Sequence, residues 1–130
     1  FKTDAIKYQR TYHLPHSPGS TDDDKMLSDY SSFLDREVVI TEKMDGENTT
    51  FYTDYLHARS VTFSPHPSRD IIQKIHAEVC YDIPEGWRIC GENLYAKHSI
   101  KYENLKSYFY VFSIWNEKNY CLPWDETVDY

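Results

Sequence analysis

Lys43 is the residue whose position in this sequence most directly suggests covalent chemistry. It lies in TEKMDGENTT (residues 41–50), after one β-favouring run and before another, and Asp45 and Glu47 lie beside it. A lysine becomes a nucleophile when its ammonium loses a proton, through burial or a neighbouring cation. The two acids instead favour the charged form, so this stretch taken alone favours an exposed lysine in a turn. Gly46 allows a sharp bend there, or a close approach of the backbone to a ligand.

Two later elements contain residues suited to nucleotide binding. Glu92 follows Gly91 in RICGENLYAKHSI (residues 88–100), and such a carboxylate can accept a hydrogen bond from a ribose hydroxyl. Phe112 lies in YFYVFSIW (residues 108–115), where its ring can meet a purine face. Taken singly, a strand-end glutamate and a core aromatic are the simpler interpretations. The sequence has no GxxxxGK[ST], GxGxxG or HExxH pattern, and we assign none of its histidines as metal ligands.

The elements that must position these residues are mostly strands. We predict strands at 37–43, 48–54, 57–63, 87–95 and 108–115, and a hairpin turn leading into 120–123. We predict a clear helix over 64–83, with Ser68 as its cap, and a short helix over 21–34. Residues 1–20 are expected to be an extended lead-in. The fold class that follows is α+β, mainly antiparallel β-sheet with few helices.

Length and charge limit the class of protein. The chain has 130 residues and a net charge of −7, which predicts one domain or part of a larger one. The acidic balance argues against a general nucleic-acid coat, although it allows a local basic cleft. Three cysteines without CxxC spacing predict reduced thiols in an intracellular, cytoplasmic protein. No apolar run reaches the length of a membrane span. LPWDETVDY begins like a helix capped by Asp125 and stops within about one turn, so we expect the N-terminal part of a longer protein.

The ordered set of elements resembles the covalent nucleotidyltransferase superfamily, and most closely its ATP-dependent RNA ligase branch. EKMDGEN (42–48) resembles motif I, KxDG, with Lys43 in the nucleophile position, and HARS (57–60) resembles the arginine element that follows it. RICGENLYAKHSI resembles motif III and FYVFSIW resembles motif IIIa. The resemblance covers most of the chain. It implies that residues 1–130 are the N-terminal part of a nucleotidyltransferase (ATP-grasp-like ligase) domain, a partial adenylyltransferase domain.

The activity that this resemblance implies is ATP-dependent RNA ligation. Lys43 would attack the α-phosphate of ATP, expel pyrophosphate and become a lysyl-AMP. The AMP would pass to an RNA 5′-phosphate, and a 3′-OH would displace it to seal the strand. ATP and Mg²⁺ are the implied cofactors and RNA ends the implied partners, and the metal would help Lys43 to lose its proton and would screen phosphate charge.

The same resemblance implies roles for five more residues. Glu92 would contact the AMP ribose, and Phe112 would stack on adenine. Arg59 would lie near ribose and phosphate, where a guanidinium stabilises charge on phosphate oxygens. Glu42 would line the adenine pocket through its backbone, and Asn48 would help to arrange the phosphates and the metal.

Two motifs of the family are not recognisable in the sequence. These are motif IV, which supplies a metal-binding carboxylate, and motif V, whose lysines hold the triphosphate, so we assign no metal ligand and expect the chain alone to bind nucleotide poorly or not at all. Two alternatives stay open. One is a non-catalytic nucleotide- or RNA-binding module or a degenerate ligase fragment. The other is a DNA ligase or an mRNA capping nucleotidyltransferase, whose lysine motifs look similar, although the flanks of motif III and the FSIW strand favour RNA ligase.

Overall fold

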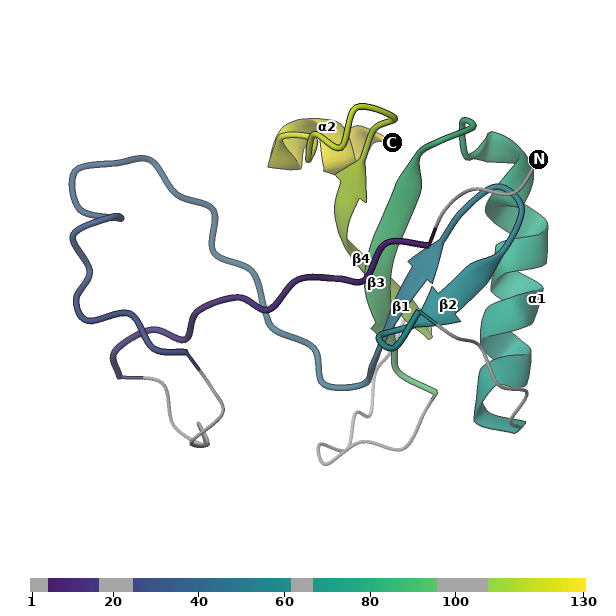
Figure 1. Cartoon of the computed structure of the whole chain (residues 1–130), viewed down its shortest axis with the longest axis horizontal. Coiled ribbons are helices and arrows are strands. Elements are labelled where there is room, and N and C mark those ends of the chain that lie inside the picture. Colours follow the sequence, from purple (N-terminus) through teal and green to yellow (C-terminus); the bar gives the residue numbers. More distant parts are fainter. Residues whose placement is uncertain (1–4, 17–24, 62–66, 96–107) are drawn as a thin grey trace. The chain divides into compact units, whose positions relative to one another are not determined.

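The computed structural model describes residues 5–16, 25–61, 67–95 and 108–130 (Figure 1). These residues belong to two compact units. One unit is Phe1–Tyr8 with Lys43–Tyr130, and the other is Gln9–Glu42. The larger unit contains every named helix and strand.

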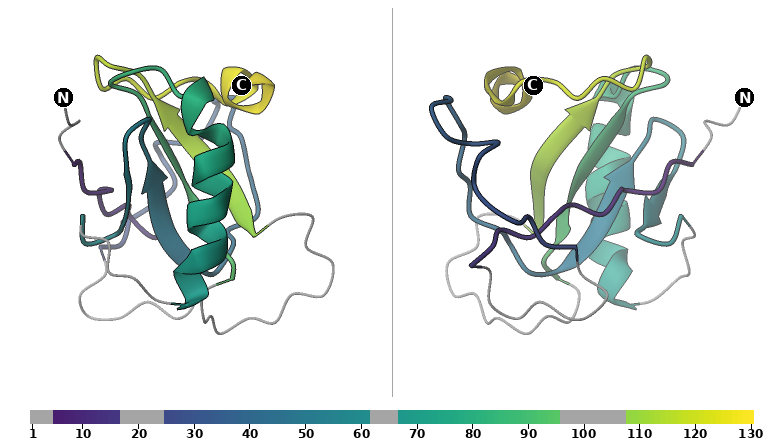
Figure 2. Two further views of the ribbon diagram at one scale, coloured as in Figure 1. Left: turned by 90° about the vertical axis from the view of Figure 1, so that its right-hand side faces the viewer. Right: turned by 60° about the vertical axis from the view of Figure 1, so that its left-hand side comes forward.

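A four-stranded antiparallel sheet is the centre of the larger unit (Figures 1 and 2). Its strand order is β2-β1-β3-β4, and the strands are β1 (Glu47–Phe51), β2 (Leu56–Ala58), β3 (Arg88–Asn93) and β4 (Phe109–Trp115). The helices are α1 (Asp70–Val79) and α2 (Trp124–Asp129), with short 3-10 turns η1 (Pro67–Arg69) and η2 (Cys80–Asp82) on either side of α1. The predicted α+β class, mainly antiparallel with few helices, is confirmed.

The hydrophobic core lies between the sheet and α1. Phe51, Ile89 and Ile114 are register partners across β1, β3 and β4, so they point to the same face of the sheet. With Ile72 of α1 they form one buried cluster, and the ring of Phe109 stacks on Phe51 at 4.3 Å between centroids. The side chains that alternate with these residues, including Asn48 and Glu92, point to the opposite face of the sheet.

The predicted helix over 64–83 is confirmed in type but is shorter than predicted. Ile72, Ile75 and Val79 recur at helical spacing on α1 and pack on the core, which is why this stretch is helical. The prediction that Ser68 caps it is wrong, because the N-cap residue is Arg69. Residues 62–66 of the predicted range lie outside the described residues.

The predicted strand over 37–43 is wrong. This segment has the β-branched residues of a strand, but it pairs with no described segment. Val39 is 60% exposed and Ile40 is 90% exposed. Strand propensity mainly reflects packing on a pleated, half-buried surface, and an apolar run without a partner strand or a covering layer gains none of that stabilisation.

The predicted helix over 21–34 is also wrong where the structure describes it. Residues 25–34 contain an isolated bridge between Met26 and His13 and a turn, but no helix. Phe33 and Leu34 are exposed, so no apolar face is buried to stabilise so short a helix. Residues 21–24 lie outside the described residues, as do 17–20 and 1–4 of the predicted lead-in.

The other predicted strands are confirmed, each shorter than predicted. The range 48–54 corresponds to β1 and 57–63 to β2, both of which begin one residue earlier than predicted, while 87–95 corresponds to β3 and 108–115 to β4. Residues 62 and 63 of the predicted range lie outside the described residues. The predicted hairpin is present as an antiparallel bridge between Trp115 and Cys121, beyond a turn at 116–119. α2 forms where a helix start was predicted, but its N-cap is Pro123, not Asp125. The helices of the described chain are all too short or too polar to cross a membrane.

Candidate active site

The lysine turn is fixed to the sheet by a hydrogen bond to Glu92. Lys43 lies four residues before β1 and its side chain is exposed. Three residues further on, the Gly46 N–H donates to Glu92 Oε2 at 3.1 Å. A Cβ on Gly46 would lie 2.4 Å from the carbonyl oxygen of Asn93, so the backbones approach too closely for any residue but glycine. The path of the chain after Lys43 is therefore determined by β3.

An ion pair holds the same turn from the other face of the sheet. Arg69 donates from Nε and Nη2 to the two carboxylate oxygens of Glu47, at 2.9 and 2.7 Å. Such forked, charge-assisted pairs define geometry more strictly than single hydrogen bonds. Glu47 is the register partner of Asn93 and therefore points away from the face that carries Glu92. η1 is thus tied to the first residue of β1.

Asn48 lies beside Glu92 on the face of the sheet opposite α1. The two residues are register partners across β1 and β3, and the alternation of the strands separates them from Phe51 and Ile89. The side-chain oxygen Oδ1 of Asn48 is buried and has no hydrogen-bond partner in the structure. Buried acceptors are seldom left unpaired in proteins, so this oxygen is suited to a ligand donor or a cation.

Three charged side chains act on the carboxylate of Glu92 at this end of the face. Burial raises the pKa of Glu92, while the Gly46 N–H and the positive charges of Lys43 and Arg59 lower it and the charge of Asp45 raises it further. Since such effects fall off with distance, Lys43, Asp45 and Arg59 all lie within electrostatic range of one partly buried carboxylate. A bound polyphosphate would pair with Lys43 and Arg59 in place of the acids. Both cations lie within electrostatic range of Glu92.

Phe112 occupies a β-bulge on the same face. The register of β3 and β4 shifts between Cys90 and Gly91, so that Cys90 pairs with Ser113 and Gly91 with Val111, leaving Phe112 as the extra residue. Bulges of this kind redirect a side chain locally. Phe112 is partly buried.

Tyr8 is the aromatic partner of Phe112. The two ring centroids are 5.2 Å apart and the ring planes meet at 77°. Burial raises the pKa of Tyr8, while a hydrogen bond with the Ser113 side chain and the charge of Arg59 lower it. Arg59 therefore acts on both Glu92 and Tyr8, which links the charged end of the face to the aromatic pair.

The structure brings most of the predicted site residues together. Asn48, Glu92 and Phe112 are partly buried on the strands. Lys43 and Arg59 are exposed, and their charges act on Glu92. Arg59 lies in the turn after β2, not inside a strand as predicted. Glu42 is exposed and is the last residue of the other unit. These positions test no role, so the functions of all six residues stay predictions.

Sequence reasoning missed Tyr8 and Arg69. Tyr8 meets Phe112 from the other end of the chain, and Arg69 meets Glu47 from beyond a loop. Both contacts are long-range in sequence, and neither residue lies in a local motif. The only sequence signal for Arg69 was its place as a cation near the start of a predicted helix. That signal does not identify Glu47 as its partner.

The oxygen donors present are compatible with Mg²⁺. Within the described part of the chain, no three His, Cys, Asp or Glu side chains gather as a complete metal site. Mg²⁺ is usually bound by one or two carboxylates together with water and substrate phosphates. Asp45, Glu92 and the unpaired Oδ1 of Asn48 are donors of that kind.

The chain was compared with known protein families, curated proteins and solved structures. A family model described as RNA ligase matches residues 36–130, which is more than half of the chain. The match includes the Lys43 turn, all four strands and both helices. No curated protein and no solved structure gives a significant match.

Proposed function

The chain belongs to the RNA ligase family, and from this we propose that it forms the adenylyl-accepting part of an ATP-dependent RNA ligase. The neutral amine of Lys43 attacks the α-phosphorus of ATP. The N–P bond forms as the bond to the bridging oxygen breaks, and pyrophosphate leaves. The AMP is then transferred from Lys43 to an RNA 5′-phosphate, and a 3′-OH attacks that phosphate and releases AMP as the phosphodiester forms.

The observation that supports this proposal best is the contact between the lysine turn and Glu92. The Gly46 N–H engages Oε2 of the carboxylate, which leaves Oε1 to accept a hydrogen bond from a ribose hydroxyl. One side chain would thereby define the path of the nucleophile's turn and the position of the sugar. Holding two reacting groups in a defined geometry is a major source of rate enhancement in phosphoryl transfer.

The other residues have roles that match their chemistry. Arg59 stabilises negative charge on the phosphates, and the ring of Phe112 stacks on adenine. The backbone of Glu42 lines the adenine pocket. Asp45 and Asn48 are the oxygen donors that would hold Mg²⁺, which, when bound, supplies positive charge that screens the phosphates and favours the neutral form of the lysine.

The direct test is covalent labelling of the full-length protein with ATP carrying a labelled α-phosphate, in the presence of Mg²⁺. We expect label that survives a denaturing gel and is lost in Lys43→Ala. Lys74→Ala is the matched control, because Lys74 is an exposed lysine of α1 and should keep the label. Absence of covalent label in a folded wild-type protein would contradict the proposal.

The same labelled protein distinguishes the alternatives. Transfer of the label to a nicked RNA in preference to a nicked DNA supports RNA ligase over DNA ligase, and labelling by GTP in place of ATP indicates a capping nucleotidyltransferase. Binding of ATP without any covalent label indicates a non-catalytic nucleotide-binding module. Repeating the labelling on residues 1–130 shows whether this part of the protein is active by itself.

A further inference from the structure

Tyr8 lies in contact with the residue proposed to stack on adenine. We propose that Tyr8 and Phe112 together form an aromatic corner that binds the purine base of the nucleotide, so that Tyr8 is a second base-contacting residue. This inference rests on the proposed function of the site, because it takes the nucleotide to be bound on this face of the sheet.

The ring geometry supports a corner better than a simple stack. The centroids are 5.2 Å apart and the planes are nearly perpendicular, at 77°. In such an edge-to-face pair, a flat base that stacks on the ring whose edge points at its partner presents its own edge to the partner's face, and both arrangements are favoured by the charge distribution of aromatic rings. With Phe112 as the stacking ring, Tyr8 is the ring whose face meets the edge of the same base.

The segment that carries Tyr8 is held to the sheet at two points. The ring of Tyr8 packs against Phe112, and the neighbouring Ser113 side chain lowers the pKa of its hydroxyl. Two residues earlier, the Ile6 N–H donates to the Tyr52 hydroxyl at 2.9 Å. Residues 5–8 cross the face of the sheet that α1 does not cover (Figures 1 and 2). The position of Tyr8 is thus fixed by specific contacts.

A buried histidine extends this anchor. The Tyr52 hydroxyl lies 3.0 Å from Nε2 of His57, whose Nδ1 lies 2.6 Å from the Ala58 carbonyl oxygen. Because a carbonyl only accepts, Nδ1 carries the proton and Nε2 accepts from Tyr52. The Tyr52 hydroxyl therefore accepts a hydrogen bond from the Ile6 N–H and donates one to Nε2 of His57. His57 in turn donates from Nδ1 to the Ala58 carbonyl oxygen.

The corner lies on the same face as the charged end of the site. Phe112 and Tyr8 are both partly buried, whereas the core ring of Phe51, on the α1 face, is only 1% exposed. The charge of Arg59 influences both Tyr8 and Glu92. A ligand with an aromatic base, a sugar and a phosphate would meet chemically matched groups along this face. A purine covers more ring area than a pyrimidine, so the corner predicts purine preference.

The test is equilibrium binding of AMP to the full-length protein, which needs no catalysis because AMP has no leaving group. We expect Tyr8→Leu to weaken AMP binding by about three- to tenfold, the scale of one aromatic contact. Tyr8→Phe keeps the ring and should bind within about twofold of wild type. Tyr81→Leu is the matched control, because Tyr81 is 90% exposed on η2, and it should change nothing.

A second readout separates base contact from mere support of the fold. We expect Tyr8→Leu to lower the ratio of AMP to CMP affinity, since a purine loses more contact than a pyrimidine. A general loosening of the sheet would weaken both nucleotides alike. Because the two rings share one base, Tyr8→Leu combined with Phe112→Leu should weaken AMP by less than the product of the single effects.

The outcomes for the corner and for the proposed function are distinct. If Tyr8→Leu leaves AMP binding unchanged while Phe112→Leu weakens it, or if the AMP to CMP ratio does not move, the corner is wrong and the ligase proposal stands. If the wild type forms no lysyl-AMP but Tyr8→Leu still lowers AMP affinity selectively, the corner is right and the ligase chemistry is wrong.

Discussion

The two faces of one sheet have opposite chemistry, although the same strands form both. On the face toward α1, the register partners Phe51, Ile89 and Ile114 are buried against Ile72. On the other face, three residues away along the strands, Asn48 pairs with Glu92. Alternation along a strand thus allows a single short strand to stabilise the fold and to carry candidate chemistry. The comparison teaches that neighbouring positions should respond to mutation in different ways.

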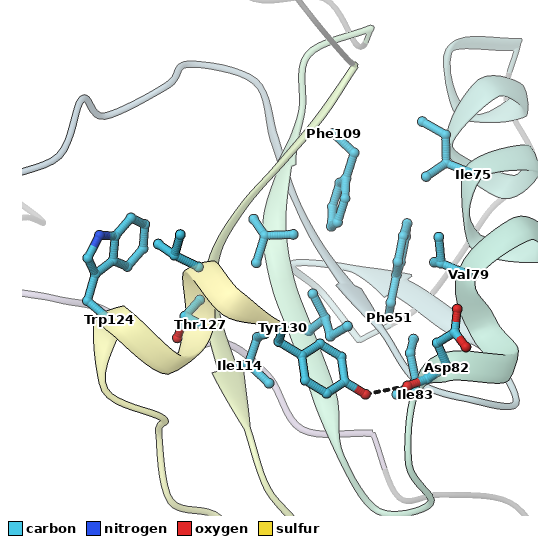
Figure 3. Close-up of a pocket in the computed structure, with 13 residues that line it drawn as sticks. Phe51, Ile75, Val79, Asp82, Ile83, Phe109, Ile114, Trp124, Thr127 and Tyr130 are labelled. Carbon is cyan, nitrogen blue, oxygen red and sulfur yellow. Dashed lines mark hydrogen bonds between the residues drawn. The ribbon is translucent and has the colours of Figure 1, made fainter.

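The α1 face also contains an open apolar pocket of about 440 Å³ between α1, β4 and α2 (Figure 3). Its walls include Phe51, Phe109 and Trp124, and the Tyr130 hydroxyl donates to the carbonyl oxygen of Asp82 across it. Among the described residues that line it, Asp82 is the one that is charged. A pocket of this composition has nothing with which to hold a polyphosphate, so the hollow in the α1 face and the candidate site are different places.

The largest expected effect comes from truncating the core ring. Phe51→Ala should lower the free energy of unfolding by about 3–5 kcal/mol, because the ring is fully buried. Thr50→Ala, at the next position on the opposite face, should cost about 1 kcal/mol, since it removes a single polar contact with Cys90. Urea denaturation of the two variants measures both values. Equal losses would show that the two faces do not differ as described.

The second prediction compares two glycines with crowded surroundings. A Cβ at Gly46 would lie 2.4 Å from Asn93 O, and one at Gly91 would lie 2.6 Å from Tyr110 O. Both alanine variants should lose about 1–3 kcal/mol of stability through forced backbone shifts. Only Gly46→Ala displaces the turn that carries Lys43, so we expect it to slow lysine adenylation at least about tenfold per folded molecule.

The control for this pair is the labelling rate measured where both variants remain folded by circular dichroism. Gly91→Ala should keep a rate close to wild type, because its new methyl group meets the ring of Phe109 on the α1 face. A loss of labelling in Gly91→Ala as large as that in Gly46→Ala would indicate that stability, not the turn, limits the reaction.

The fold could be predicted from the sequence where local pattern and tertiary partner agree. β3, β4 and α1 have apolar residues at strand or helix spacing, and each buries them against the others. Residues 37–43 have the same β-branched composition, yet Ile40 is 90% exposed. Pattern records the capacity for burial, and whether a partner is available depends on the rest of the chain.

The candidate site follows the same rule. Glu92 and Phe112 could be proposed from motifs because each lies in a recognisable strand, and Lys43 could be proposed because its KxDG motif comes just before one. Tyr8 and Arg69 could not, since they reach the site through contacts that join distant parts of the chain. No local pattern encodes such a contact.

The third prediction concerns the stability cost of the charged face. Burial raises the pKa of Glu92 above its ordinary value of 4.5. At a pH between this ordinary value and the raised pKa of the folded state, the folded protein therefore binds more protons than the unfolded chain. The free energy of unfolding therefore falls as pH rises through this range. Glu92→Gln keeps an acceptor for the Gly46 N–H without the charge. The difference in the free energy of unfolding between this variant and the wild type should therefore shift in favour of the variant from pH 4 to pH 7.

An exposed glutamate provides a control of opposite sign. The pKa of Glu117 is lowered by hydrogen bonds from its own backbone N–H and from Trp87 Nε1. Glu117→Gln should therefore lose more stability relative to wild type at pH 7 than at pH 4. Thermal melts from pH 4 to 7 measure both variants. Parallel pH profiles for the two would contradict the assignment of a desolvated carboxylate to the candidate site.

The smallest expected effect comes from His57, which anchors the segment that carries Tyr8. Burial is the main cause that lowers the pKa of His57 below 6.5. Below pH 6.5 the unfolded chain then binds more protons than the folded one, so the free energy of unfolding falls with acidification, by at most about 1.4 kcal/mol per pH unit for one proton. His57→Gln should flatten this slope between pH 7 and 5, whereas His16→Gln, at an exposed histidine, should keep it.

The same protonation should also affect ligand binding. Because protonation of Nε2 of His57 removes the hydrogen-bond acceptor for the Tyr52 hydroxyl, AMP affinity should weaken over the same pH range in wild type. An unchanged slope in His57→Gln would show that the anchor of residues 5–8 does not depend on a neutral histidine.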